Sequence, residues 1–268
     1  MLNINYFKYN TLSLVFLIVS LVLLSCNSND ATVKAPQEDA AAKKVLQGTW
    51  INEFEGNAVF SVKGDTIYYN DTLSTPASFY IANDTLFIEN HSLVKYPIKS
   101  INSTNLVFIN SDGDEVSLVK SSTTLSTGEY KGAVNLNQGK KVKKDTVMTY
   151  STKRYHAYTQ VNPTTYKVYR QTTNSDGLSV ESVYYDNIVY LALYEGQQKI
   201  FGQNIVKSEF QSLVPKTYLD SAVLSEIVVD RVGSEGVTFV AVLTIPDSYT
   251  NYRVNILISP DGKKTLSL

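Results

Sequence analysis

The sequence predicts a mainly β protein. We expect an antiparallel N-terminal domain, closed as a barrel-like or curled sheet, and an α+β C-terminal domain with one or two short helices. Two observations lead to this fold class. Short apolar runs alternate with polar residues at a period of two, as in strands with one buried face. Asn, Asp and Gly residues stand between these runs, where the positive φ angles of tight turns favour them.

The composition agrees with a folded sheet protein. Of the 268 residues, 43% are hydrophobic and 18% are charged, a balance that allows a sizeable core. The chain contains 19 tyrosines, and Tyr favours strands because its ring packs on a pleated surface while its hydroxyl reaches water. The formal net charge of −1 provides no general attraction for nucleic acid, so we expect no nucleic-acid partner.

Residues 1–25 are predicted to be a signal peptide. Lys8 precedes an apolar run over residues 12–24, which is short for a membrane-spanning helix of about 20 residues but matches a signal-peptide core. The run ends in Leu23-Leu24-Ser25-Cys26, which resembles the lipobox of bacterial lipoproteins. The resemblance implies that Cys26, the single cysteine, is lipidated and becomes the first mature residue. The alternative is a transmembrane anchor with an incidental cysteine.

Lipidation predicts a location in the cell envelope, with the membrane as a partner. Several acyl chains hold a protein firmly, because each buried methylene contributes about 0.8 kcal/mol. An Asp after the lipidated cysteine is typical of inner-membrane retention, so Asn27 favours the outer membrane, on its periplasmic face or at the cell surface. Residues 26–44 are rich in Asn, Asp, Ala, Lys and Glu, which predicts a flexible tether.

Residues 45–121 are predicted to form the N-terminal β-domain as consecutive hairpins. The expected strand pairs are residues 58–62 with 66–69, 79–81 with 86–88, and 96–101 with 106–109, before a strand at 116–119. The Ser/Thr-rich segment 122–128 that follows is expected to be a linker between domains.

Residues 129–268 are predicted to form the α+β domain. The expected strands cover residues 146–150, 166–171, 182–185, 188–194, 199–201, 227–229, 236–243, 251–258 and 265–268. Between residues 207 and 225 the pattern favours one or two short helices, with Ser208 as a cap and Pro215 near a first turn.

Two stretches resemble known families. Gly48-Thr49-Trp50 and the hairpins up to Lys120 resemble the small lipocalin-like domains of Bacteroidota lipoproteins, in which a Gly-x-Trp opens the first strand and its ring closes one barrel end. The second resemblance is to an uncharacterised family of Bacteroidota lipoproteins, known as a domain of unknown function, and it rests on residues 207–210, 218–224, 239–245 and 252–262. It implies an envelope location, and it implies neither an activity nor site residues.

Catalytic and metal-binding motifs are missing from the sequence. His91 and His156 lie in different predicted domains without a companion at metal-ligand spacing, so we expect surface or interstrand positions for both. The thiol of Cys26 is reserved for lipid, which excludes a thiol enzyme. No Gly-x-Ser-x-Gly, His-Glu-x-x-His or P-loop motif occurs. We therefore expect a protein that is not an enzyme and holds no metal or other cofactor.

One dense basic cluster is present at Lys140-Lys141-Val142-Lys143-Lys144. It is either a solvated loop or a contact for anionic lipid head groups or another polyanion.

A short pattern recurs in both predicted domains: Asp, then Ser or Thr, then a small or apolar residue. It resembles the O-glycosylation sequon of exported Bacteroidota proteins, and it makes candidate modification sites of Thr66, Thr72, Thr85, Thr146 and Ser221. The alternative is that a turn followed by a strand produces this pattern anyway.

Three functions fit the sequence. The first is a non-enzymatic binding or scaffold lipoprotein whose Tyr-rich strands contact a protein, a glycan or another envelope component. The second is a carrier that holds a small apolar ligand in the N-terminal β-domain, provided that the expected lining does not simply fill the core. That lining consists of Phe60, Tyr68, Phe79, Phe87 and Phe108. The third is a glycan or peptide hydrolase, which needs two carboxylates converging in a cleft.

Overall fold

The computed structural model of the chain describes residues 37–122, 131–137 and 139–268. The predicted signal peptide, Cys26, most of the predicted tether and most of the predicted linker at 122–128 lie outside these residues. Glu38–Leu268 form one compact unit. Within the described residues, no helix has both the length and the apolar character needed to span a membrane.

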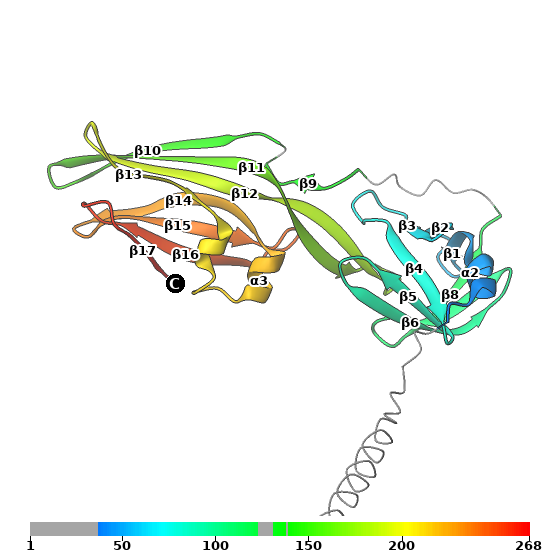
Figure 1. The fold of residues 1–268 in the computed structure, drawn as a ribbon. Helices are drawn as coiled ribbons and strands as arrows, with labels where there is room; N and C mark the ends of the chain where they lie inside the picture. Colours follow the sequence, from blue (N-terminus) through cyan, green and yellow to red (C-terminus); the bar gives the residue numbers. More distant parts are fainter. Residues whose placement is uncertain (1–36, 123–130, 138) are drawn as a thin grey trace, which may run out of the picture. The chain divides into compact units, whose positions relative to one another are not determined.

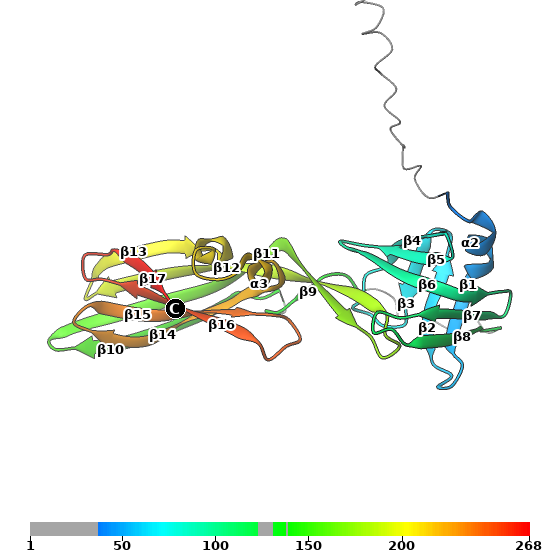
Figure 2. The ribbon, with the colours of Figure 1, turned by 90° about the horizontal axis from the view of Figure 1, so that it is seen from below.

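Eight antiparallel strands form a closed barrel at the N-terminal end of this unit (Figure 1; Figure 2). They are β1 (Gly48–Asn52), β2 (Ala58–Lys63), β3 (Thr66–Tyr69), β4 (Ala77–Ala82), β5 (Thr85–Glu89), β6 (Leu93–Ile101), β7 (Asn105–Ile109) and β8 (Glu115–Lys120). Each strand pairs with the next one along the chain, and β1 also pairs with β8. The antiparallel meander is thus confirmed, and its closure is a full barrel.

The turn between β4 and β5 shows how the sequence directs these hairpins. Asn83 and Asp84 adopt φ angles of 47° and 50°. A two-residue turn with positive φ at both positions matches the right-handed twist of the flanking strands, and Asn and Asp tolerate this conformation best after Gly. The hairpin predicted from the strands at 79–81 and 86–88 is therefore confirmed.

Large side chains occupy the barrel interior. Of the aromatic residues expected to line a cavity, Phe60, Phe79 and Phe108 point inward and are at most 3% exposed. The prediction was wrong for Tyr68 and Phe87, which face outward because Ile67 and Tyr69, or Leu86 and Ile88, take the inward positions of their strands. A period of two fixes which residues share a face, but not which face is buried.

A short helix, α2 (Ala40–Leu46), covers one end of the barrel. The Asp39 carboxylate caps it by accepting hydrogen bonds from two backbone N–H groups, and Leu46 is fully buried. The helix begins inside the segment predicted to be a tether up to residue 44. Burial of the apolar end of the helix against the barrel explains why these residues are ordered.

Trp50 and Lys120 bind the C-terminal end of α2 to this end of the barrel. The Trp50 Nε1 donates to the Leu46 carbonyl at 2.7 Å, and the Lys120 ammonium lies 4.9 Å from the centre of the Trp50 ring. The same ammonium donates to the Val45 carbonyl at 2.5 Å, and burial lowers the pKa of Lys120. The Gly48-Thr49-Trp50 segment thus opens the first strand and supplies the ring at the closed end.

The other end of the barrel is covered by a hairpin from the C-terminal part of the chain. Leu178 and Val180 are buried within the barrel core. The Ser179 N–H donates to the Tyr96 hydroxyl at 2.7 Å, and Asn52 Nδ2 donates to Asp176 at 2.9 Å. This hairpin therefore contributes two side chains to the hydrophobic core of the barrel.

The C-terminal part contains two antiparallel sheets. The first sheet consists of β10 (Val142–Tyr150), β11 (Lys153–Thr173), β12 (Ser179–Glu195) and β13 (Gln198–Ile205), with β9 (Val134–Asn135) parallel to β12. The second sheet consists of β14 (Val223–Gly233), β15 (Gly236–Thr244), β16 (Asn251–Ile258) and β17 (Lys264–Ser267). Figure 1 shows the second sheet against one face of the first, and a common core of apolar side chains joins them.

Helical structure between the two sheets is limited to the 3₁₀ helix η1 (Lys207–Phe210) and α3 (Lys216–Ser221). The short helices and the position of Pro215 just before α3 are confirmed. Ser208 was wrongly predicted as a cap: it lies inside η1, and the Glu209 carboxylate accepts from the Val206 N–H instead. Among the described residues the C-terminal part is mainly β, so the helices connect strands and form no separate layer.

A buried polar group secures the point where β12, η1 and β14 meet. The Asp186 carboxylate accepts from the backbone N–H of Asn187 and Leu224, both at 2.9 Å. Its other oxygen lies 3.3 Å from the ammonium of Lys207, which also donates to the Ala222 carbonyl at 2.7 Å. Side-chain charge and backbone donors are therefore paired at this junction, as burial requires.

Candidate functional site

The outer face of the first sheet carries a group of half-exposed aromatic and amide side chains. Along β11, alternate residues from Tyr155 to Val161 point into the core and are buried, so their neighbours point outward. No described strand or helix covers this outer face in Figure 1. We call it the tyrosine face and define it by five residues, His156, Tyr158, Gln160, Tyr190 and Tyr194.

Two ring pairs organise the tyrosine face. The His156 and Tyr194 rings stack with centroids 5.7 Å apart, and the Tyr158 and Tyr190 rings meet edge to face at 6.2 Å. The register places Ala192 opposite Tyr158, between the two β12 tyrosines. Such pairs hold the rings in place and contribute about 0.5–1.5 kcal/mol each beyond simple burial.

Small residues lie between these tyrosines, where Ala192 on β12 is paired with Gly202 on β13. Ala192 is fully buried. A side chain at Gly202 would collide with Lys199, whose side chain covers this glycine. The sheet between Tyr190 and Tyr194 is therefore filled rather than hollow.

Lys199 places a positive charge between Tyr190 and Tyr194. Its ammonium donates to the Tyr190 hydroxyl at 2.8 Å and lies 5.5 Å from the centre of the same ring. The hydrogen bond to Tyr190 raises the pKa of Lys199, so the side chain is protonated at neutral pH.

A chain of polar groups runs along β11 beside the rings. The Tyr158 hydroxyl donates to Gln160 Oε1, and Gln160 Nε2 donates to Asn162 Oδ1, each at 2.6 Å. His156 Nε2 lies 2.7 Å from the Asp145 carboxylate. These contacts fix the side-chain orientations before any ligand arrives, which lowers the entropy lost on binding.

Cations outnumber carboxylates on this face. Alternation along the strands turns Lys143, Arg154 and Lys199 outward together with one carboxylate, Asp145. The predicted basic cluster at residues 140–144 is divided by the sheet, because Lys144 points the other way and pairs with Glu226 at 2.6 Å. With histidine neutral, three cations and one carboxylate leave the face with an excess of two positive charges.

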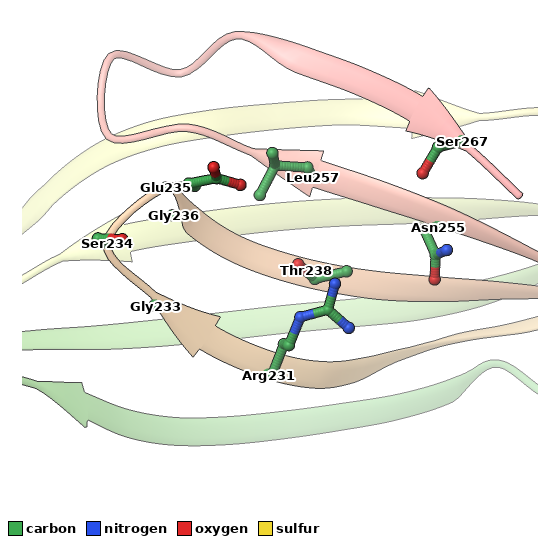
Figure 3. A pocket seen from close by; sticks show the side chains of 9 residues that line it. All are labelled: Arg231, Gly233, Ser234, Glu235, Gly236, Thr238, Asn255, Leu257 and Ser267. Atoms are coloured by element: carbon green, nitrogen blue, oxygen red, sulfur yellow. The ribbon is translucent and has the colours of Figure 1, made fainter.

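A separate polar pocket of about 320 Å³ lies on the second sheet (Figure 3). Arg231, Thr238 and Asn255 line it from neighbouring strands, and Glu235 lies at the β14–β15 turn. Glu235 is the one carboxylate among its lining residues. Hydrolysis of a glycosidic bond ordinarily needs two carboxylates, and the lining of this pocket supplies one.

The two histidines lie apart. His91 stacks on Tyr169 with ring centroids 4.5 Å apart, whereas His156 belongs to the tyrosine face. In the part of the chain that the structure describes, no group of three His, Cys, Asp or Glu residues is placed to hold a metal ion.

The candidate O-glycosylation sites differ in local structure. Thr66 and Thr85 open strands after turns, and Thr72 lies in a bend, as the pattern predicts. Thr146 lies in the middle of β10 and Ser221 ends α3, so these two do not follow a turn into a strand. None of the five is buried, and modification stays a prediction.

Comparisons with known proteins agree with the second resemblance in the sequence. No curated protein matches the chain. One family model matches residues 123–266, which include the tyrosine face and the lining of the pocket on the second sheet except Ser267. Because this segment is more than half of the 268 residues, the chain belongs to the family described as "Domain of unknown function (DUF4738)".

Proposed function

We propose that this protein is a non-enzymatic binding module of the cell envelope, anchored by lipid on Cys26 and binding its partner through the tyrosine face. The observation that carries the proposal is the tyrosine face itself: ordered rings, amides and cations on an uncovered sheet. Tyr supplies a large contact area with a polar tip at a low entropic cost. The apolar run before Cys26 supports the anchor, and Asn27 supports the outer membrane as its location.

The barrel serves in this proposal as a lipocalin-like support. Its first strand opens with Gly48-Thr49-Trp50, and Lys120 from the last strand covers the tryptophan ring. The carrier alternative has less support, because α2 covers one end, the hairpin tip covers the other, and aromatic side chains point into the interior. A carried ligand would have to displace buried side chains, each at a cost of about 1.5–3 kcal/mol.

The binding proposal is tested with the full chain in detergent and an immobilised extract of the envelope of the producing cells. We expect wild-type protein to be retained and the Tyr158→Ala, Tyr194→Ala double variant to lose about tenfold in affinity, as for central aromatic contacts. Tyr166→Ala is the matched control, because Tyr166 lies on the same strand, 64% exposed, outside the tyrosine face. Equal retention of all three proteins would refute the proposal.

The anchor is tested separately, by the mass of the native protein. We expect a chain that begins at Cys26 and carries acyl chains, and we expect Cys26→Ser to abolish both the cleavage and the added mass. An uncleaved chain without lipid would show that the apolar run is an anchor in its own right.

A further inference from the structure

We infer that the ligand of the tyrosine face is an acidic glycan, a sugar chain that carries carboxylate, sulfate or phosphate groups. This inference rests on the proposed binding function and names the class of partner. Three properties of the face support it: the spacing of its rings, its hydrogen-bonding groups and its charge.

The spacing of the rings suits flat polar molecules. Tyr190 and Tyr194 are four residues apart on β12, which is roughly 13 Å along a strand. Between them Ala192 is fully buried and Lys199 covers Gly202, so the two rings stand on a surface without a deep groove. The C–H groups of a sugar ring pack well on aromatic surfaces, whereas an extended apolar peptide would favour a deeper and drier groove.

The hydrogen-bonding groups suit hydroxyl-rich molecules. In the chain from Tyr158 through Gln160 to Asn162, each amide accepts one hydrogen bond at its oxygen and donates one from its nitrogen. Each amide nitrogen carries a second hydrogen and each amide oxygen a second lone pair, which remain for further hydrogen bonds. A sugar hydroxyl both donates and accepts, so it can bind at either kind of group. Because the amides already hold one another, little further ordering is needed on binding.

The charge suits an anion. Lys199 lies over Gly202 between the two rings, and Lys143 and Arg154 extend from the neighbouring strands. The carboxylate on this face, Asp145, is engaged by His156. A neutral glycan would leave these cations without a role, whereas an acidic glycan supplies acceptors for charge-assisted hydrogen bonds.

The test measures binding of three probes to the full chain in detergent by calorimetry: an oligogalacturonate, a neutral glucan of equal length, and polyglutamate. We expect the oligogalacturonate to bind, the neutral glucan to bind at least about tenfold more weakly, and added salt to weaken the interaction. Lys199→Gln and Tyr194→Ala should each weaken it about tenfold, and Tyr166→Ala should leave it unchanged. Circular dichroism of each variant verifies that the sheets, including the one that carries the substitutions, remain folded.

Each other outcome overturns the inference in a different way. Equal binding of the neutral glucan would show that charge does not select the ligand, and equal binding of polyglutamate would show attraction to any polyanion. If the protein is retained on the envelope extract through Tyr158 and Tyr194 but binds no acidic glycan, the partner is another molecule and the proposed binding function stands. If neither the extract nor the probes depend on these tyrosines, both the inference and the proposed function fall.

Discussion

Truncation of Leu178 tests whether the hairpin of the C-terminal part stabilises the barrel. Leu178 is fully buried among barrel side chains, although almost half of the 268-residue chain separates it from β1 (Gly48–Asn52). Leu178→Ala removes a buried aliphatic group that the surroundings fill only in part, which costs about 2–5 kcal/mol. With a urea dependence of about 3 kcal/mol per M, the unfolding midpoint should fall by about 1 M.

The single tryptophan makes this effect measurable in the barrel. Trp50 is the one tryptophan in the sequence and is fully buried there, so its fluorescence follows barrel unfolding, while circular dichroism follows all sheets. We expect both midpoints to fall together in Leu178→Ala. Leu93→Ala is the matched control, because Leu93 is 48% exposed on the barrel itself and should change the free energy of unfolding by less than about 0.5 kcal/mol. An unchanged Trp50 midpoint in Leu178→Ala would show that the hairpin does not stabilise the barrel.

Three further substitutions test buried polar groups by the same urea unfolding. Asp186→Ala should lower the free energy of unfolding by about 3–5 kcal/mol, because the Leu224 N–H and the charge of Lys207 lose their partner. Asp186→Asn should lower it less, because the amide oxygen still accepts a hydrogen bond. Equal losses in the two variants would contradict this argument. Tyr69→Phe should stabilise by up to about 1–3 kcal/mol, since the buried Tyr69 hydroxyl has no hydrogen-bond partner among the described residues; a lower midpoint would show that a partner exists. Burial raises the pKa of Glu181, so the ionised carboxylate is disfavoured in the folded state. The protonated Glu181 therefore stabilises the fold at pH values below the ordinary Glu pKa, and this stabilisation is lost as the pH rises through the raised pKa. Glu181→Gln should therefore raise the midpoint at neutral pH and lose this gain on acidification, and a gain independent of pH would contradict the argument.

The barrel hairpins could be predicted because local chemistry determines them. Asn83 and Asp84 adopt positive φ angles that few other residues tolerate, so the turn is visible in the sequence. Whether Ile67 or Tyr68 faces the interior is decided by the whole barrel, since both alternating sets contain large apolar side chains.

The tyrosine face could be predicted only in part. Tyr190 and Tyr194 share a face by alternation within one expected strand, and that signal was present in the sequence. The residues of the face that lie on β11 were not predicted. The buried positions of β11 include Ala157, which is small, and Thr159, which is polar, so the strand lacks a clear alternation of large apolar and polar residues. β11 also contains Pro163, which lies where the ladder is irregular, and an irregular ladder tolerates a residue without an N–H.

The insertion of the hairpin into the barrel could not be predicted. The order of Asp176, Leu178 and Val180 reads as an ordinary turn into a strand, and nothing local shows which core receives these side chains. Contacts between segments so distant in sequence depend on the assembled surfaces of both.

The most direct test of the tyrosine face is chemical nitration of tyrosines in the full chain, with and without envelope extract, read by mass spectrometry. We predict that the extract protects Tyr158, Tyr190 and Tyr194. Tyr166 and Tyr249, which are 64% and 104% exposed, should stay as reactive as before and act as internal references. Protection confined to the references, or none at all, would contradict the assignment of this face as the binding surface.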